Sequence, residues 1–214
     1  DGETADLGVQ AALTGHLVFS TLHTNNAATC LPRLLDMNIE PFLIASTVRI
    51  VIGQRLVRRL CPDCRQTYTP DNQELQHLAK IFGIGPRISI EKLNGLEKLA
   101  LQRGVGASNP STVNTADLRV LSSTETTIAH LWRASDEGCD TCNHTGYKGR
   151  MGIYEVLPNT EKVQALIVAN STSEKIEKQA IEDGMVTMQI DGLVKALRGQ
   201  TTIEEILRVT AEGA

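Results

Sequence analysis

The stretch Gln54–Cys64 reads QRLVRRLCPDC and joins a segment of strand character to two closely spaced cysteines. Alternation along a strand would place Arg55 and Arg59 on one face and Arg58 on the other. We therefore expect at least one of these arginines to have an anionic partner. The closing Cys-Pro-Asp-Cys presents two thiols on one tight turn, which is typical of half a tetrahedral metal site.

A second pair of the same kind, Cys139-Asp-Thr-Cys142, lies much later in the chain. Two such turns can complete a tetrahedron of thiolates around one Zn²⁺ at about 2.3 Å. The interval 65–138 exceeds the roughly 15–20 residues of a compact ribbon, so two unrelated turns or a redox pair remain alternatives. Repeated pairs in a reducing compartment are more often ligands than disulfides. The predicted ligands of a structural Zn²⁺ are Cys61, Cys64, Cys139 and Cys142.

The composition is that of an ordinary globular protein. The 214 residues are 41% hydrophobic and 21% charged, enough for one large domain or for two. Three Phe, three Tyr and one Trp form no stacking platform for single-stranded nucleic acid, and a net charge of −4 disfavours polyanions, so no nucleic-acid partner is expected. Neither a signal peptide nor a membrane span is visible, which predicts a cytoplasmic location.

Strand and helix patterns alternate along the chain. The segment HLVFSTL, residues 16–22, is rich in β-forming residues and lies between two helical patterns, which predicts a buried strand of a parallel sheet. Residues 151–157 predict another strand. The tail after it is helical, with capping-box patterns at Ser171-x-x-Glu174 and Thr202-x-x-Glu205. We therefore predict the α/β class.

The interval between the cysteine pairs has a different texture. Helical stretches are predicted near 72–82 and 91–103, and the turn-forming run GVGASNPSTVNTAD at 104–117 is predicted to be a mobile loop.

Candidate ligand-binding residues gather in the segment TGHLVFSTLHTN, residues 14–25. His16 and His23 lie at opposite ends of the predicted strand, and strand ends are common places for ligand contacts in parallel sheets. From the residues alone, a hydrogen-bonded strand-end histidine explains each position better than a catalyst, since no paired base or nucleophile is evident. The sequence has no GxxxxGK[ST] loop, so we expect the chain alone not to bind ATP well.

Four motifs resemble, in order, the C-terminal part of the type II secretion and type IV pilus assembly ATPases, the GspE/PilB family. They are the run from Glu3 to Leu35 with TGHLVFSTLHTN, then QRLVRRLCPDC, then GCDTCNHTGYKGRMGIYEVL, then DGMVTMQIDGLVKALRGQTTIEEILRVT. The resemblance leaves about 67–135 unassigned.

This resemblance implies a RecA-like P-loop NTPase core with an inserted tetracysteine zinc subdomain and a C-terminal helical subdomain. Residues 1–60 would be the C-terminal half of the core, 61–149 the zinc subdomain with its long insertion, and 150–214 the return strand and helical subdomain. The family's P-loop, acidic box, arginine fingers and general-base glutamate would precede residue 1. The chain would then be a fragment or a gene annotated short, inactive by itself, and a regulatory half-protein is the alternative.

The resemblance also implies roles for individual residues. The two histidines match the family's histidine box, which implies sensing of the γ-phosphate. Asp1 and Glu3 match positions just after the Walker B sequence, near Mg²⁺, and Arg55 and Arg58 fall in an element close to the nucleotide. The four paired cysteines match the family's zinc ligands. The expected nucleotide-proximal or sensing residues are Asp1, Glu3, His16, Thr21, His23, Arg55 and Arg58.

The implied function is that of a hexameric motor whose ATP hydrolysis drives assembly of a pilus or pseudopilus. Its cofactors would be ATP, Mg²⁺ and structural Zn²⁺. Its partners would be an inner-membrane platform protein and a membrane-anchored adaptor, which would hold it at the cytoplasmic side of the bacterial inner membrane. Two other classes remain: a stand-alone zinc-stabilised interaction module without ATPase activity, and a thiol-disulfide oxidoreductase, which Pro62 in the first cysteine pair alone supports.

Overall fold

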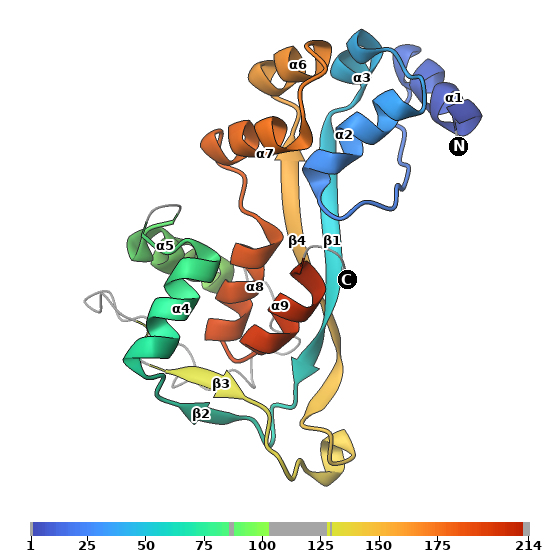
Figure 1. The fold of residues 1–214 in the computed structure, drawn as a ribbon. Helices are drawn as coiled ribbons and strands as arrows, with labels where there is room; N and C mark the ends of the chain where they lie inside the picture. Colours follow the sequence, from blue (N-terminus) through green and yellow to red (C-terminus); the bar gives the residue numbers. More distant parts are fainter. Residues whose placement is uncertain (1, 86–87, 103–127, 129, 212–214) are drawn as a thin grey trace. The chain divides into compact units, whose positions relative to one another are not determined.

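The structure is a computed structural model that describes residues 2–85, 88–102, 128 and 130–211 (Figure 1). Asp1 and the expected loop at 104–117 therefore lie outside the described residues. Contacts divide the chain into two compact units, which are described separately below. Unit 1 comprises Asp1–Arg55 and Tyr154–Met188, and unit 2 comprises Leu56–Ile153 and Gln189–Ala214.

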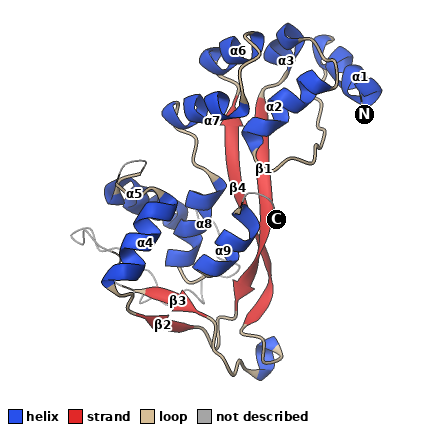
Figure 2. Cartoon of the chain, in the orientation of Figure 1, coloured by secondary structure: helices blue, strands red, loops and turns tan. Residues whose placement is uncertain are grey.

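Both units contain helices and strands (Figure 2). The helices of unit 1 are α1 (Gly2–Leu13), α2 (Ala27–Asp36), α3 (Pro41–Thr47), α6 (Glu161–Val168) and α7 (Ser173–Glu182). Unit 2 contains α4 (Asn72–Phe82), α5 (Ile90–Gln102), α9 (Ile203–Thr210), the 3₁₀ turn η3 (Asp140–Cys142), β2 (Gln66–Tyr68) and β3 (Leu131–Arg133). The paired strands β1 (Ile50–Leu60) and β4 (Tyr147–Pro158) contribute residues to both units, and α8 (Met188–Leu197) begins with the last residue of unit 1.

The core of unit 1 is an apolar cluster between its helices and the inward face of β4. Leu31, Ile44, Leu157, Val163 and Ile167 are fully buried in it. Helix α3 packs against α6, and α2 packs against α7. These contacts fix α2, which carries Thr29 and Arg33 of the pocket described for this unit.

Helix α2 starts after an N-cap residue, Asn26. The side-chain oxygen of Asn26 accepts a hydrogen bond from Thr29 N at 2.9 Å, and the Thr29 hydroxyl lies within 3.4 Å of Asn26 N. This reciprocal arrangement is a capping box, which satisfies N–H groups that lack partners inside the helix.

The prediction of a buried strand at 16–22 is wrong. This segment has no regular secondary structure, and Leu17 and Phe19 are 81% and 87% exposed. A strand needs a neighbour to pair its backbone N–H and C=O groups, and the described strands offer none here. The apolar, β-forming composition of the segment was therefore not sufficient to make a strand.

The capping box expected at Ser171 is also wrong, because α7 starts two residues later. Thr172 is the N-cap residue and makes no side-chain cap bond. Ser171 N instead donates to Leu166 O at 2.9 Å and so closes the end of α6. The second predicted cap is confirmed in part: Thr202 Oγ1 accepts from Glu205 N at 3.3 Å and begins α9.

The helices expected near 72–82 and 91–103 are confirmed in unit 2 as α4 and α5. The second is confirmed as far as residue 102, the last described residue of that stretch. Strands β2 and β3 pair antiparallel from Gln66↔Arg133 to Tyr68↔Leu131, which brings together the two ends of the long interval. The strand expected at 151–157 is confirmed as part of β4, which already begins at Tyr147.

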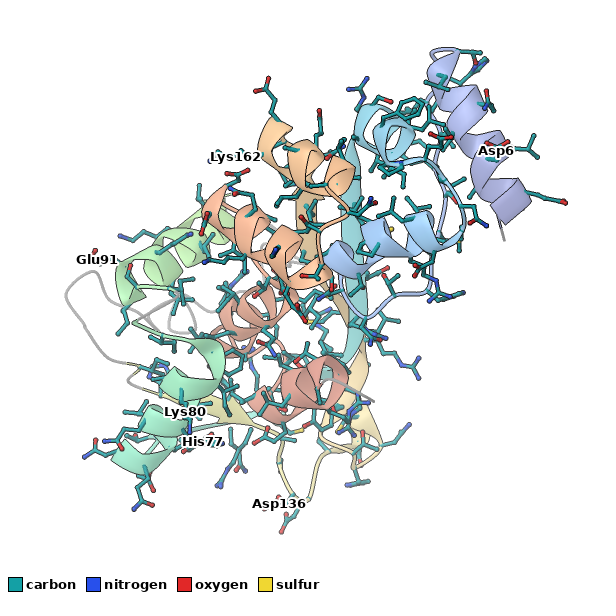
Figure 3. The ribbon with its side chains drawn as sticks, turned by 45° about the horizontal axis from the view of Figure 1, so that its top comes forward. Asp6, His77, Lys80, Glu91, Asp136 and Lys162 are labelled. Carbon is teal, nitrogen blue, oxygen red and sulfur yellow. The ribbon has the colours of Figure 1, made fainter. Side chains whose placement is uncertain are left out.

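The α/β class is thus confirmed, while the three segments expected at 1–60, 61–149 and 150–214 differ from the two units and stay a prediction. Charged and polar side chains such as Asp6, His77 and Lys162 are exposed (Figure 3). Within the described part of the chain, no helix combines the length and the apolar character needed to span a bilayer.

Candidate functional site

The four paired cysteines of unit 2 converge on one point. Their sulfur atoms all lie within 4.8 Å of one another. Cys61 Sγ is 3.7 Å from Cys139 Sγ, and Cys64 Sγ is 3.8 Å from Cys142 Sγ. Four sulfurs bound at about 2.3 Å around one tetrahedral ion would be separated by about 3.8 Å. The cluster therefore has the spacing of a tetrahedral metal site, and these distances are far too long for disulfides, which need about 2.05 Å.

Tight turns place each pair. The first turn follows the end of β1: Cys61 N donates to Gly146 O at 3.0 Å, and Arg65 N donates back to Cys61 O at 3.1 Å. The second pair begins just after Gly138, whose φ is +63° and whose Cβ, if present, would lie 2.4 Å from the backbone carbon of His144. Glycine is thus required at this position for the turn to close.

Burial and hydrogen bonds affect the ionisation of the four thiols differently. Burial opposes ionisation of Cys142, but hydrogen bonds from Cys139 N (3.3 Å) and Gly146 N (3.2 Å) help to lower its pKa to about 6. Burial, followed by hydrogen bonding to Cys139, raises the pKa of Cys64 to about 12, and burial also raises the pKa of Cys61. A metal ion would supply the positive charge that lets all four thiols ionise.

The turn that carries Cys61 and Cys64, here called the metal-site turn, contacts the connection between α8 and α9 within unit 2. The Arg65 guanidinium lies over the Trp132 ring, 4.4 Å from its centroid, and donates to Gly199 O at 2.7 Å. Thr201 Oγ1 donates to Arg58 O at 2.8 Å. Arg65 thereby places a cation just beyond the C-terminal end of α8, where the helix dipole favours positive charge.

Arg58 has the acidic partner that strand alternation predicted. Its Nη2 and its backbone N each lie 2.8 Å from a carboxylate oxygen of Glu205, and its guanidinium lies 4.0 Å from the centroid of the Tyr147 ring. Arg208 binds the same carboxylate at 2.8 Å. The prediction of an anionic partner is therefore confirmed, and the partner is Glu205 of α9. A place for Arg58 beside a nucleotide stays a prediction.

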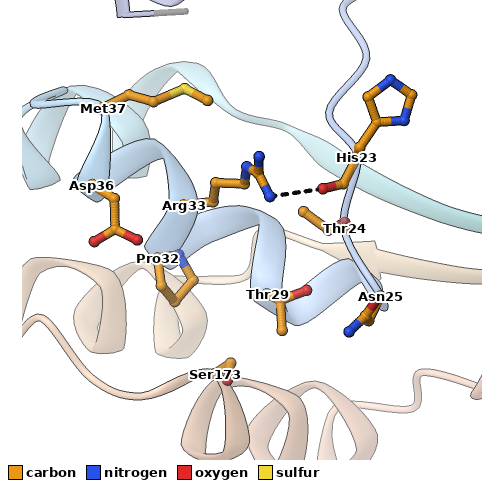
Figure 4. Close-up of a pocket in the computed structure, with 9 residues that line it drawn as sticks. All are labelled: His23, Thr24, Asn25, Thr29, Pro32, Arg33, Asp36, Met37 and Ser173. Carbon is orange, nitrogen blue, oxygen red and sulfur yellow. Dashed lines mark hydrogen bonds between the residues drawn. The ribbon is translucent and has the colours of Figure 1, made fainter. Parts of the chain in front are cut away.

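The segment His23–Asn25 of unit 1 lies just before α2 and is contacted by Arg55. Arg33 Nη1 donates to His23 O at 2.9 Å, and Arg55 Nη2 donates to Asn25 Oδ1 at 3.2 Å. This segment borders an open pocket of about 530 Å³ (Figure 4). The residues that line the pocket are His23, Thr24, Asn25, Thr29, Pro32, Arg33, Asp36, Met37 and Ser173.

The other predicted nucleotide-proximal residues are placed elsewhere in unit 1. His16 Nδ1 lies 2.9 Å from Thr14 Oγ1, and Glu3 and Thr21 are exposed. Among the described residues, no hydrogen bond joins His16 or Glu3 to His23. The structure thus gathers His23 and Arg55 around one segment of unit 1, and a nucleotide site made by the whole predicted set stays a prediction.

Sequence reasoning missed Glu155, although a signal was present. Alternation in the predicted strand 151–157 puts Glu155 on the same face as Ile153 and Leu157, so a charge falls on an apolar face. In the structure Glu155 is 4% exposed, and its carboxylate accepts hydrogen bonds from Ala27 N and Met188 N.

The fold and the cysteine cluster together define an α/β protein with a candidate tetracysteine metal site. A profile of the family described as "Type II/IV secretion system protein" matches residues 1–208, and the chain belongs to this family.

Named relatives match nearly the whole chain. "Type II secretion system protein E" of Aeromonas hydrophila is 40% identical over 212 residues, which cover 99% of this chain and 33% of the relative. "Type II secretion system ATPase E" of Vibrio cholerae is 38% identical over 212 residues, with the same two coverages. "Type IV pilus assembly ATPase PilB" of Myxococcus xanthus is 35% identical over 211 residues, covering 99% of this chain and 30% of the relative. The chain spans about a third of the length of these relatives.

Proposed function

We propose that this chain is the C-terminal portion of a hexameric motor ATPase that couples ATP hydrolysis to assembly of a pilus or pseudopilus. The observation that carries the proposal is the family match over residues 1–208, together with relatives named as secretion and pilus assembly ATPases. Because the sequence has no GxxxxGK[ST] loop, we expect no ATPase activity from the isolated chain.

In this proposal the chain completes a RecA-like core. Residues 1–60 are the C-terminal half of that core, 61–149 the zinc subdomain and 150–214 the return strand and helical subdomain. The exposed apolar side chains of Leu17 and Phe19 support a larger parent protein, because such side chains are ordinarily covered by a further surface.

The metal in this proposal is a structural Zn²⁺. Cys61, Cys64, Cys139 and Cys142 would hold it, and four thiolates leave no open coordination position for a substrate. When bound, the ion would supply only positive charge and a fixed geometry.

The nucleotide, with Mg²⁺, is proposed to lie beside Asp1, Glu3, His16, Thr21, His23, Arg55 and Arg58. Phosphoryl transfer is catalysed by groups outside this chain, and the present residues respond to loss of the γ-phosphate. His23 suits a sensing role because its side chain is exposed at the pocket, while Arg33 fixes its backbone carbonyl. Arg58 would remain bound to Glu205 and contribute through that pair.

The movement that follows would act on an inner-membrane platform protein and a membrane-anchored adaptor. This would place the motor in the cytoplasm, at the inner membrane through its partners.

The sensing role is tested by His23→Ala in the longer protein that contains this chain. We expect the ATPase rate to fall by about ten-fold to a hundred-fold, a size typical of a lost positioning contact, together with pilus or secretion output. His77→Ala is the matched control, because His77 is an exposed histidine of α4 in unit 2. Unchanged ATPase rate and output in His23→Ala would show that His23 senses nothing.

A further inference from the structure

A single buried carboxylate holds the starts of two helices. Glu155 Oε1 accepts from Ala27 N at 2.5 Å, and Glu155 Oε2 accepts from Met188 N at 3.2 Å. Ala27 is the first residue of α2, and Met188 is the first residue of α8. The first N–H groups of a helix lack partners inside it and carry the positive end of its dipole. The Glu155 carboxylate therefore satisfies one of these N–H donors at the start of each helix.

A neighbouring glycine makes this contact possible. A Cβ at Gly53 of β1 would lie 2.8 Å from Glu155 Cγ, 2.9 Å from Glu155 Oε1 and 3.3 Å from Ala27 N. Any side chain at position 53 would displace the carboxylate from the helix start. Ala27 and Ala28 are each 1% exposed, and their small side chains let the start of α2 lie against the strands.

The start of α2 carries the segment that borders the pocket. The Thr24 hydroxyl donates to Asn26 O at 3.0 Å, and Asn25 accepts from Arg55 at 3.2 Å. His23 O accepts from Arg33, as the dashed line in Figure 4 shows. The backbone from His23 to Ala27 is thus held at several points, and the contact with Glu155 ties it to β4.

We infer that Glu155 is a positioning residue that sets the place of His23–Asn25 at the pocket by anchoring Ala27. The inference rests on the proposed function, since it assigns the positioned segment to nucleotide sensing. The same carboxylate binds Met188, where the chain leaves unit 1. If the pocket segment shifted and withdrew Ala27 N, one oxygen of this buried carboxyl group would lose its donor. The carboxyl group would then move, and its hydrogen bond to Met188 N would change as well.

The anchor is tested first in this chain by Glu155→Gln. Glutamine keeps the size of the side chain, but it offers one acceptor oxygen and turns an NH₂ group toward the other helix start. We expect amide hydrogen exchange at Ala27 or Met188 to become about ten-fold faster or more, because one buried N–H loses its partner. Glu161→Gln is the matched control: Glu161 is the exposed first residue of α6, and its loss should leave both amides unchanged.

Gly53→Ala is a second route to the same effect, because it displaces the carboxylate without removing it. Unchanged exchange at Ala27 and Met188 in both Glu155→Gln and Gly53→Ala would overturn the anchor.

The positioning role is tested by ATP hydrolysis in the longer protein that contains this chain. We expect Glu155→Gln to lower kcat by roughly ten-fold or more with little change in KM, since misplacement of a sensing segment affects the chemical step more than binding. A purely structural role would lower Tm and leave kcat per folded molecule unchanged, and that result would overturn the inference. A wild-type protein that hydrolyses no ATP would instead overturn the proposed function and the positioning role with it, while the exchange experiment would still judge the anchor.

Discussion

Glu205 is a carboxylate whose ionisation is controlled by two arginines. It is 1% exposed and accepts hydrogen bonds from Arg58 and Arg208 of unit 2. Burial alone would raise the pKa of Glu205, but the hydrogen bonds from Arg208 and Arg58 lower it to about 2. The charged form is therefore the one that the folded state favours.

This arrangement predicts a specific pH dependence of stability. A carboxyl group with a lowered pKa in the folded state stabilises the fold above its ordinary value of 4.5, and this contribution disappears as the pH falls toward about 2. Glu205→Gln should lose about 1–3 kcal/mol at neutral pH, a range that allows for solvent screening of the two exposed arginines. Its difference from wild type should shrink between about pH 4.5 and pH 2.

Urea unfolding at a series of pH values measures this difference. Glu204→Gln is the control, because Glu204 is the exposed neighbour of Glu205 in α9. A difference that did not change with pH would contradict a role for the ionised Glu205.

For single residues, the sequence predicted that an arginine of β1 needs an anionic partner, but it did not predict that this partner is Glu205. Strand alternation correctly required an anion for at least one arginine of β1. The sequence interpretation placed Glu205 in a capping box with Thr202, and only the Thr202 half of that box is present. The carboxylate binds two arginines instead. Arg208 lies one turn further along α9, a spacing that the sequence does record, whereas Arg58 is far away in the chain and no local pattern points to it.

At the scale of the elements, the turn between α8 and α9 packs closely against β3 and against Arg65, which follows the metal-site turn. Gly199 in this turn has a φ of +66°, and a Cβ there would lie 2.7 Å from the Trp132 ring and 2.8 Å from Arg65 Nη1. Both neighbours are themselves in contact, so neither can move without disturbing the other.

Gly199→Ala should therefore destabilise the fold more than backbone strain alone explains. We expect a loss of about 2–4 kcal/mol in the free energy of unfolding, from an unfavourable φ together with overpacking. Gly184→Ala is the matched control, because Gly184 also has a positive φ, +106°, and has open space where its Cβ would lie. That variant should lose only about 1 kcal/mol, and equal losses in the two would contradict the overpacking.

Element prediction succeeded where hydrophobic periodicity and helix ends agreed, as in α4, α8 and α9. It failed at residues 16–22, where β-forming residues found no strand to pair with among the described residues. A strand needs a partner strand, which is often far away in the sequence, whereas a helix satisfies its own backbone hydrogen bonds.

On the scale of the whole chain, the metal should matter to one unit more than the other. Purified chain should contain about one Zn per molecule, as a closed four-thiolate site requires. Removal of the metal with a chelator should speed amide exchange in unit 2, first around 58–65 and 198–202, which are joined by hydrogen bonds. The core of unit 1, which includes Leu31 and Ile44, should keep its protection.

Elemental analysis and hydrogen exchange measure these effects. The double variant Cys61→Ser/Cys139→Ser should lose the metal, whereas Cys30→Ser, outside the cluster, should retain it. Stoichiometric disulfides, or an equal loss of protection in both units, would contradict a structural metal confined to unit 2.

Family membership and the gathering of the four paired cysteines could be predicted from the sequence because both reside in short, ordered motifs. The anchoring of α2 by Glu155 could not, because it joins residues far apart in the chain through backbone N–H groups. Every residue type except proline supplies such a group, so these contacts leave no mark in the sequence.

The pairing of β2 with β3 has a consequence for protein engineering. The segment between Tyr68 and Leu131 begins and ends at paired residues, so its two ends are already adjacent. The entropy of closing a loop rises slowly with its length, by about 0.6 kcal/mol for each doubling. Foreign sequence, such as an epitope or a fluorescent domain, could therefore be spliced into this interval while the ladder and the cysteine cluster keep the junction closed.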